Sequence, residues 1–149
     1  MPTMTTMPTT PTTQLPSTLP LSRLRRVTDY IHEHLDQHLT LAQLGAVVFM
    51  SPYHFARLFQ HSTGVPPHRF VVRARIDHAT ALLAAPELSI AQISRVVGFR
   101  TPSHFATVFH RIMGVTPREY RARHVHDARA RRDAVPSAVE REGGRDGMQ

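Results

Sequence analysis

A twenty-residue unit occurs twice in this chain of 149 residues, and it constrains the fold more than any other feature. Residues 51–70 read SPYHFARLFQHSTGVPPHRF, and residues 101–120 read TPSHFATVFHRIMGVTPREY. The similarity extends upstream, where LAQLGAVV at 41–48 matches IAQISRVV at 90–97. A repeat of this length is shorter than a domain, so the sequence predicts two copies of one supersecondary unit within a shared fold.

Each copy carries the boundary signals of two short helices. A hydroxyl residue followed three positions later by Gln, at Thr40 and at Ser89, is typical of a capping box. A second hydroxyl residue precedes proline at 51–52 and at 101–102, and proline is well tolerated in the first turn of a helix. A glycine then ends the second helix of both copies. Two short helices joined by a turn form a helix-turn-helix unit.

The complete pattern predicts an all-α domain with seven helices and no strand. The two helix-turn-helix units are expected at 41–63 and 90–113, as homeodomain-like three-helix units joined by a long linker helix at 67–84. An amphipathic first helix is expected at 22–37, and a last helix from residue 117.

Both ends of the chain differ in composition from this predicted domain, which spans 21–125. Residues 1–20 form a Thr/Pro-rich tract with few large apolar side chains, and residues 126–149 are charged and end in a Gly-rich stretch. Neither segment can bury enough apolar surface to offset the entropy lost on ordering. Both are therefore predicted to be disordered tails, the second of them for most of its length.

Composition excludes several classes of protein. The chain has no cysteine, which rules out disulfides, thiolate zinc sites and a cysteine nucleophile. No apolar run approaches the roughly 20 residues that a membrane span needs, and residues 1–20 lack the basic start and the apolar centre of a signal peptide. No catalytic triad order, phosphate-binding glycine loop or pair of catalytic carboxylates occurs. We expect a cytoplasmic protein that is not an enzyme and does not bind membranes.

The positive charge is concentrated on the repeat-containing segment. Between residues 21 and 123 the chain holds thirteen Arg and six acidic residues, which accounts for the whole net charge of +7. A small basic domain favours a polyanionic partner. A double-stranded DNA partner explains the paired helix-turn-helix units; the alternative is a basic helical module that binds an acidic protein, RNA or a membrane surface.

The second helix of each unit has an anchoring face and an outward face. The anchors are Phe55, Leu58 and Phe59 in the first copy and Phe105, Val108 and Phe109 in the second. The outward residues are Tyr53, Ala56, Arg57 and Gln60 in the first copy and Ser103, Ala106, Thr107, His110 and Arg111 in the second. Because the anchors recur while the outward residues differ, we expect two non-identical readers, used by a monomer on an asymmetric DNA site.

Several basic side chains allow two interpretations. For His54 and His104, partial burial and DNA contact are equally supported. Arg100 lies near the expected groove, so DNA contact is favoured there. For Arg69, Arg73 and Arg75 on the linker helix, a solvated helix face is favoured over phosphate contact. The pair His34 and His38 has helical spacing but no third ligand, so we expect a solvated face there and no metal or other cofactor.

The arrangement resembles the DNA-binding domain of AraC-type (AraC/XylS) transcriptional regulators, in which a long helix joins two helix-turn-helix units. The second copy carries that family's most specific signature at Gly98-Phe99, Phe105, Phe109, Gly114, Thr116-Pro117 and Tyr120-Arg121. The resemblance spans residues 21–123 and implies a regulator, either stand-alone or a fragment of a longer one, that binds promoter DNA and contacts RNA polymerase as an activator. It places base-reading positions at Tyr53, Ala56, Arg57, Pro102, Ser103, His104, Ala106 and Thr107.

Four residues depart from the family pattern. Gly45 and Ser94 replace an alanine that is common in the first helix of each unit, and Gly45 should weaken its helix by up to about 1 kcal/mol. Phe49 occupies a turn position where glycine is frequent. Thr107 stands where a long polar residue is common, which suggests that the second reader is the less specific one.

Overall fold

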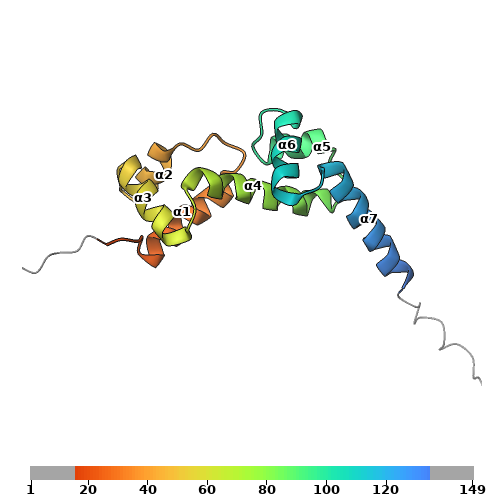
Figure 1. Cartoon of the computed structure of the whole chain (residues 1–149), viewed down its shortest axis with the longest axis horizontal. Coiled ribbons are helices and arrows are strands. Elements are labelled where there is room, and N and C mark those ends of the chain that lie inside the picture. The colour runs from red at the N-terminus through yellow and green to blue at the C-terminus, as the bar shows by residue number, and fades with distance from the viewer. Residues whose placement is uncertain (1–15, 135–149) are drawn as a thin grey trace, which may run out of the picture. The chain divides into compact units, whose positions relative to one another are not determined.

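The computed structural model describes residues 16–134, and within this range it contains seven helices and no strand (Figure 1). The helices are α1 (Leu21–Glu33), α2 (Leu41–Val47), α3 (Pro52–Thr63), α4 (Pro67–Leu83), α5 (Ile90–Val96), α6 (Pro102–Met113) and α7 (Pro117–Asp133). The predicted all-α class and both helix-turn-helix units, α2–α3 and α5–α6, are confirmed.

The described residues form two compact units, each with one helix-turn-helix. The first unit combines the residues up to His34 with His38–Val72, and the second combines Leu35–Gln37 with the residues from Arg73 onward. In the first unit α2 packs against α1 and α3; in the second, α6 packs against α5 and α7. The helix α4 contributes its first residues to one unit and its remaining residues to the other.

The same aromatic packing holds the second helix of each helix-turn-helix in its core. In the first unit the Phe59 ring meets the edge of Phe70, with ring centroids 5.2 Å apart and planes at 89°. In the second unit Phe109 meets Tyr120 in the same way, at 5.6 Å and 79°. Both Phe side chains are fully buried. Edge-to-face ring pairs stabilise the fold beyond the free energy gained by burying the rings. Because Phe59 and Phe109 are buried in these pairs, the predicted anchors are confirmed as core residues.

The predicted helix caps are present. The Thr40 and Ser89 hydroxyls accept hydrogen bonds from the backbone N–H three residues later, and the Gln at that position bonds back, so both capping boxes form. A third capping box starts α7 at Thr116. At the other ends, Gly64 and Gly114 have φ values of 81° and 76°, the left-handed conformation expected of a C-terminal glycine.

Three predicted boundaries differ from those in the structure. The N-terminal tail was expected to run to residue 20, but Leu19 is buried and its N–H donates to the Ser62 hydroxyl on α3 at 2.8 Å. The C-terminal tail was expected from residue 126, but α7 continues to Asp133, because Ala and Arg are good helix formers. Residues 1–15 and 135–149 of the expected tails lie outside the described residues. The first helix ends four residues early, at Glu33.

The turns of the two helix-turn-helix units reach similar backbone conformations with different residues. In the second unit the turn residue is Gly98, with φ 94°; its counterpart in the first unit is Phe49, with φ 59° and a side chain that is 82% exposed. Gly45 fits this turn, because a Cβ there would lie 2.7 Å from the Met50 carbonyl oxygen. Gly45 thus has a packing role in addition to its cost in helix propensity.

Phe49→Gly is expected to stabilise the protein by about 0.5 to 1 kcal/mol. A left-handed conformation costs an L-residue roughly 1 to 2 kcal/mol, and glycine removes that cost while losing somewhat more chain entropy on folding. The exposed Phe49 ring contributes little packing that could be lost. The midpoint of urea unfolding measures the change. Phe49→Ala is the control, since it removes the ring but keeps the strained backbone; an equal gain in both variants would contradict the strain argument.

Candidate nucleic-acid interface

The outward face of α3 lies opposite its buried side chains. Phe55 is fully buried, whereas Tyr53 is 80% exposed at the second position of the helix. Arg57 and Gln60 are exposed one and two turns later, and Ala56 is half-buried between the two faces. The predicted first reader is therefore one continuous accessible surface, starting at the N-terminal end of α3, the end that enters the major groove in helix-turn-helix proteins.

The second candidate surface is on α6. Its predicted members at the start of the helix are all exposed: Pro102, Ser103, His104 and Thr107. Ala106 is half-buried, like its counterpart Ala56. Arg100 lies exposed just before α6, and Arg111 and His110 are exposed near its end. Every residue predicted on this reader is accessible in part or in full.

Hydrogen bonding limits what Thr107 can read. Its hydroxyl donates to the Ser103 backbone carbonyl at 3.0 Å, so the single hydroxyl hydrogen is already used within α6. The oxygen lone pairs stay available, which leaves Thr107 as an acceptor for an amino group on a base edge. In the first reader Arg57 stands at the equivalent position and offers several donors. The two readers therefore differ in chemistry as well as in sequence.

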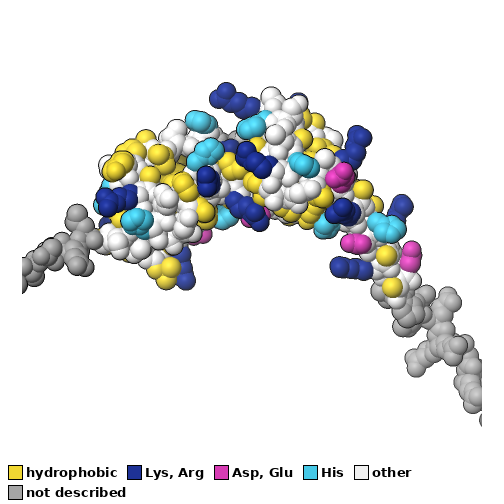
Figure 2. Space-filling model, in the orientation of Figure 1, with side chains coloured by type: hydrophobic (Ala, Val, Ile, Leu, Met, Phe, Trp, Pro, Cys, Tyr) yellow, Lys and Arg dark blue, Asp and Glu magenta, His cyan; other side chains and the backbone are white. Residues whose placement is uncertain are grey.

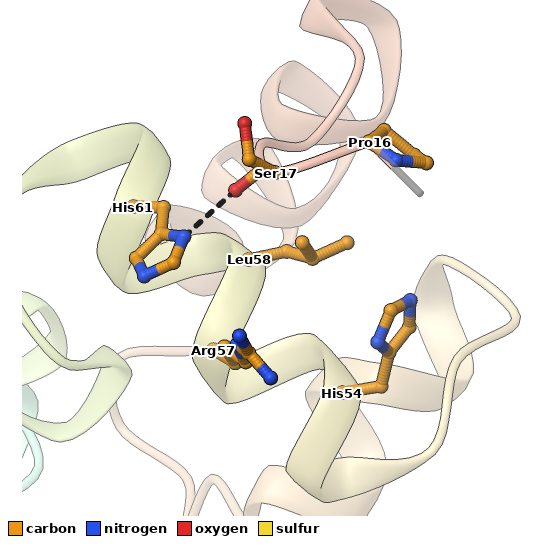
Figure 3. A pocket seen from close by; sticks show the side chains of 6 residues that line it. All are labelled: Pro16, Ser17, His54, Arg57, Leu58 and His61. Atoms are coloured by element: carbon orange, nitrogen blue, oxygen red, sulfur yellow. Dashed lines mark hydrogen bonds between the residues drawn. The ribbon is translucent and has the colours of Figure 1, made fainter. Parts of the chain in front are cut away.

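The two ambiguous histidines have different surroundings. His104 is exposed, and its ring forms a T-shaped pair with Phe99, with the ring centroids 5.4 Å apart. His54 is half-buried and lines a cavity of about 190 Å³ together with Pro16, Ser17, Arg57, Leu58 and His61 (Figure 3). The structure thus brings His54 and Arg57 into one pocket, which we call the α3 flank pocket. Sequence reasoning missed His61, although its spacing of seven residues from His54 places both on one side of a helix.

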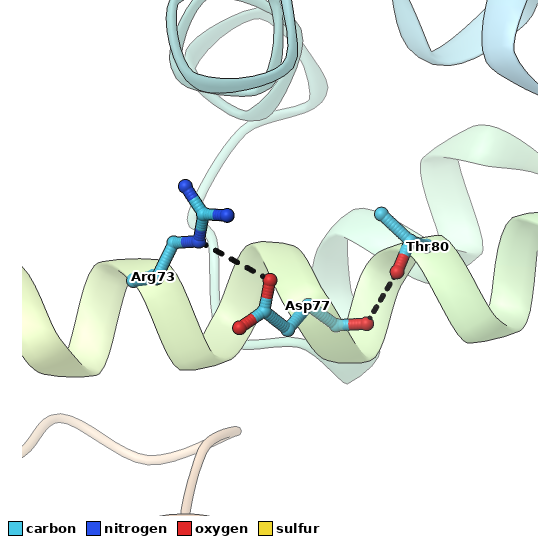
Figure 4. A network of polar contacts seen from close by, with 3 residues as sticks. All are labelled: Arg73, Asp77 and Thr80. Atoms are coloured by element: carbon cyan, nitrogen blue, oxygen red, sulfur yellow. Dashed lines mark hydrogen bonds and ion pairs between the residues drawn. The ribbon is translucent and has the colours of Figure 1, made fainter.

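Two arginines of α4 have different roles. Arg73 lies on the solvated face of the helix and pairs with Asp77 at 3.3 Å, while Thr80 donates to the Asp77 carbonyl at 2.6 Å (Figure 4). Both partners of this ion pair are about 60% exposed, so its contribution to stability is small.

Arg75 does not lie on a solvated face, and that prediction is wrong for this residue. Its Nε donates to the Leu35 carbonyl at 3.0 Å and its Nη2 to the Gln37 carbonyl at 2.8 Å. Burial lowers the pKa of Arg75, and the neighbouring Asp36 carboxylate opposes that shift. These contacts make Arg75 a structural residue of the second unit.

The charge distribution of the described surface suits an anionic partner. On the face drawn in Figure 2, Arg and His side chains are spread over each unit, and acidic side chains are few. Hydrophobic side chains gather over α2 and α3, where Phe49 and Tyr53 are the strongly exposed aromatic residues.

Among residues 16–134, no cluster of three His, Asp or Glu side chains could hold a metal ion. None of the helices in the described part of the chain is long and apolar enough to cross a membrane.

Comparison with known proteins relates this geometry to a family. Residues 44–123 match the helix-turn-helix domain family. The chain is similar to the probable transcriptional regulator LumQ of Photobacterium leiognathi, with 33% identity over 73 residues that make up 49% of this chain and 29% of LumQ. It is also similar to the regulatory protein PocR of Salmonella typhimurium, with 37% identity over 78 residues, 52% of this chain and 26% of PocR. The chain therefore matches less than a third of the length of these curated relatives.

A solved structure resembles the chain over most of its described length. The DNA-binding domain of the global transcriptional factor AdpA, crystallised with a target DNA, aligns with a TM-score of 0.65 and 31% identity, covering 76% of this chain and 98% of that domain. The family match spans more than half of the 149 residues. This protein therefore belongs to the AraC-type helix-turn-helix family, whose members are DNA-binding transcriptional regulators and not enzymes.

Proposed function

We propose that this chain binds promoter DNA in a sequence-specific manner and regulates transcription, acting in the cytoplasm as a monomer on an asymmetric site. The proposal rests on one observation above all. The helices α3 and α6 are held by equivalent buried Phe residues but present different accessible side chains on their opposite faces. A duplicated scaffold with two different readers suits an operator with two different half-sites, whereas a symmetric dimer would need a palindrome.

The length of the connecting helix supports the use of two grooves by one chain. The helix α4 has 17 residues, which corresponds to about 26 Å at 1.5 Å per residue. Successive major grooves on one side of B-DNA are about 34 Å apart. We therefore include in the proposal that α3 and α6 insert into adjacent major grooves. By resemblance to its family, we also propose that the chain is an activator that contacts RNA polymerase.

Footprinting on a duplex selected from a random pool tests the proposal. We expect two protected patches about one helical turn apart, with different base preferences in the two patches. A single protected patch would mean that only one unit engages DNA. If the pool yields no preferred sequence, the domain is not a sequence-specific regulator, and the alternative of a basic helical module for an acidic protein, RNA or a membrane surface gains support.

Arg57→Ala is expected to weaken binding to the selected duplex by roughly 1 to 3 kcal/mol, with a much smaller loss on random duplex. An Arg in the first turns of a recognition helix can bond guanine O6 and N7 together, and that contact is lost only on the specific site. Fluorescence anisotropy at several salt concentrations measures both affinities, and log Kd should change by about 0.9 per log unit of salt for each neutralised phosphate. Arg129→Ala on α7 is a matched control. Equal losses on both duplexes would show that Arg57 contacts phosphate.

A further inference from the structure

Two hydrogen bonds join the segment that precedes α1 to α3 beside the α3 flank pocket. The His61 ring nitrogen Nδ1 lies 2.9 Å from the Ser17 carbonyl oxygen, and because a carbonyl only accepts, Nδ1 carries the hydrogen. Two residues later, the Leu19 N–H donates to the Ser62 hydroxyl, and the Leu19 side chain is buried. These contacts hold Pro16 and Ser17 alongside α3, so that α3 and the preceding chain segment enclose the pocket together (Figure 3).

The charge of the pocket lining is positive and uncompensated. Arg57 supplies a permanent guanidinium, His54 and His61 supply imidazoles, and no carboxylate is among the described residues that line the pocket. Within residues 16–134, no Asp or Glu forms an ion pair with Arg57; the ion pair found there joins Arg73 to Asp77. A guanidinium binds planar or tetrahedral oxyanions through two parallel hydrogen bonds, and an imidazole N–H can add a third.

The size and remaining lining of the pocket admit more than a bare ion. Its volume of about 190 Å³ exceeds that of a cavity of about 150 Å³, which is known to hold a benzene ring. Leu58 and Pro16 add apolar side chains to the lining. The lining thus combines cationic and apolar groups, a combination that suits a carboxylate or phosphate carried on a small organic body.

We propose that the α3 flank pocket is an oxyanion site that shares Arg57 with the DNA-reading surface. The oxyanion comes from a small free carboxylate or phosphate, or from a phosphate of the DNA backbone beside α3. A free anion in the pocket engages Arg57 and competes with DNA, which would make the pocket a regulatory site within the DNA-binding domain. The part of this inference that concerns DNA rests on the proposed function; the binding of a free anion does not.

The second unit supplies an internal control. His104 is the repeat counterpart of His54, but the position equivalent to Arg57 holds Thr107, which carries no charge. An oxyanion that binds through Arg57 should therefore leave the His104 ring unaffected. His78 on α4 is exposed and remote in sequence from the pocket, and serves as a second reference for non-specific effects of salt.

The test is an NMR titration of the histidine ring signals of the full chain with phenylacetate or inorganic phosphate, at fixed pH and ionic strength set with chloride. We expect saturable shifts at His54 and His61 but not at His104 or His78, and loss of these shifts in Arg57→Gln. His61→Ala and Ser62→Ala each remove one of the two hydrogen bonds that hold the segment before α1 against α3, and both should weaken anion binding several-fold. The urea midpoint of each variant verifies that it is folded.

A parallel titration with the selected duplex distinguishes the two sources of the oxyanion. If the pocket takes a DNA phosphate, the duplex shifts His54 and His61, and His61→Ala lowers DNA affinity several-fold while free anions have no saturable effect. If it takes a free anion, phenylacetate or phosphate competes with DNA in the wild type and competes several-fold less well in His61→Ala. Absence of saturable shifts with free anions, together with unchanged DNA affinity in His61→Ala, would overturn the proposal even if DNA binding itself is confirmed. Anion binding without DNA binding would instead refute the proposed function and retain the pocket.

Discussion

Gly98→Ala should destabilise the protein by roughly 2 to 6 kcal/mol, which is a large part of the 5 to 15 kcal/mol typical of a folded domain. Two effects add at this position. With φ at 94°, an L-residue is held in a strained conformation that costs about 1 to 3 kcal/mol. A Cβ at Gly98 would also overlap the Leu35 carbonyl oxygen and lie 2.9 Å from the Arg75 Nε, and overpacking of this kind costs a further 1 to 3 kcal/mol.

The loss is expected to be large because the clashing atom belongs to the backbone. The Leu35 carbonyl accepts a hydrogen bond from Arg75, so moving it away from the new methyl group would leave a partly buried guanidinium without one of its partners. Urea unfolding monitored by circular dichroism measures the change. Gly114→Ala is the matched control, since Gly114 has a φ of 76° but a Cβ added there would meet no atom within 4 Å. Similar losses at the two glycines would show that the contact with Leu35 contributes nothing.

Phe109→Ala is expected to cost roughly 3 to 5 kcal/mol of folding free energy. The side chain is fully buried, and its ring contacts Phe105 at 5.6 Å and the edge of Tyr120 at 5.6 Å. Removal leaves a cavity between α6 and α7 that these neighbours can fill only in part. Because Phe59 occupies the same position in the first unit, Phe59→Ala should have an effect of similar size.

Tyr53→Ala provides the comparison for this prediction. Tyr53 is 80% exposed, so its removal should change the urea midpoint little, while weakening binding to the selected duplex. Comparison of the Phe109→Ala and Tyr53→Ala variants thus distinguishes a loss of folding stability from a loss of DNA affinity. A Phe109→Ala protein that keeps its unfolding free energy but loses DNA affinity would assign Phe109 to the interface and contradict its role as a core anchor.

The features that sequence reasoning predicted well are local. The capping boxes at Thr40 and Ser89 and the C-terminal glycines at 64 and 114 depend on residues within a few positions of each other, and all are present. The buried Phe stripes follow from helical periodicity alone. The candidate readers on α3 and α6 are accessible for the same reason: a residue on the face opposite a buried stripe has nothing to pack against.

The errors occurred where packing between distant segments decides the outcome. Leu19 lies near the end of a segment that was predicted to be disordered from its composition. Its side chain is nevertheless buried, and its N–H donates to the Ser62 hydroxyl on α3. Arg75 sits on a helix whose exposed positions hold other arginines, and no local signal distinguishes it from Arg73. The positive φ of Phe49 was likewise not predicted, although its repeat counterpart is a glycine, Gly98, which has a positive φ as well.

By itself, the sequence determined the helices, their caps, the duplication and the two different outward faces, because each of these depends on short-range hydrogen bonding and on a periodicity of 3.6 residues. The tertiary structure alone decided that Arg75 binds the carbonyl of Leu35, 40 residues away, and that His61 binds that of Ser17, 44 residues away. Contacts over such separations form only when the packed core brings the segments together. For that reason the α3 flank pocket and the close approach at Gly98 are properties of the fold.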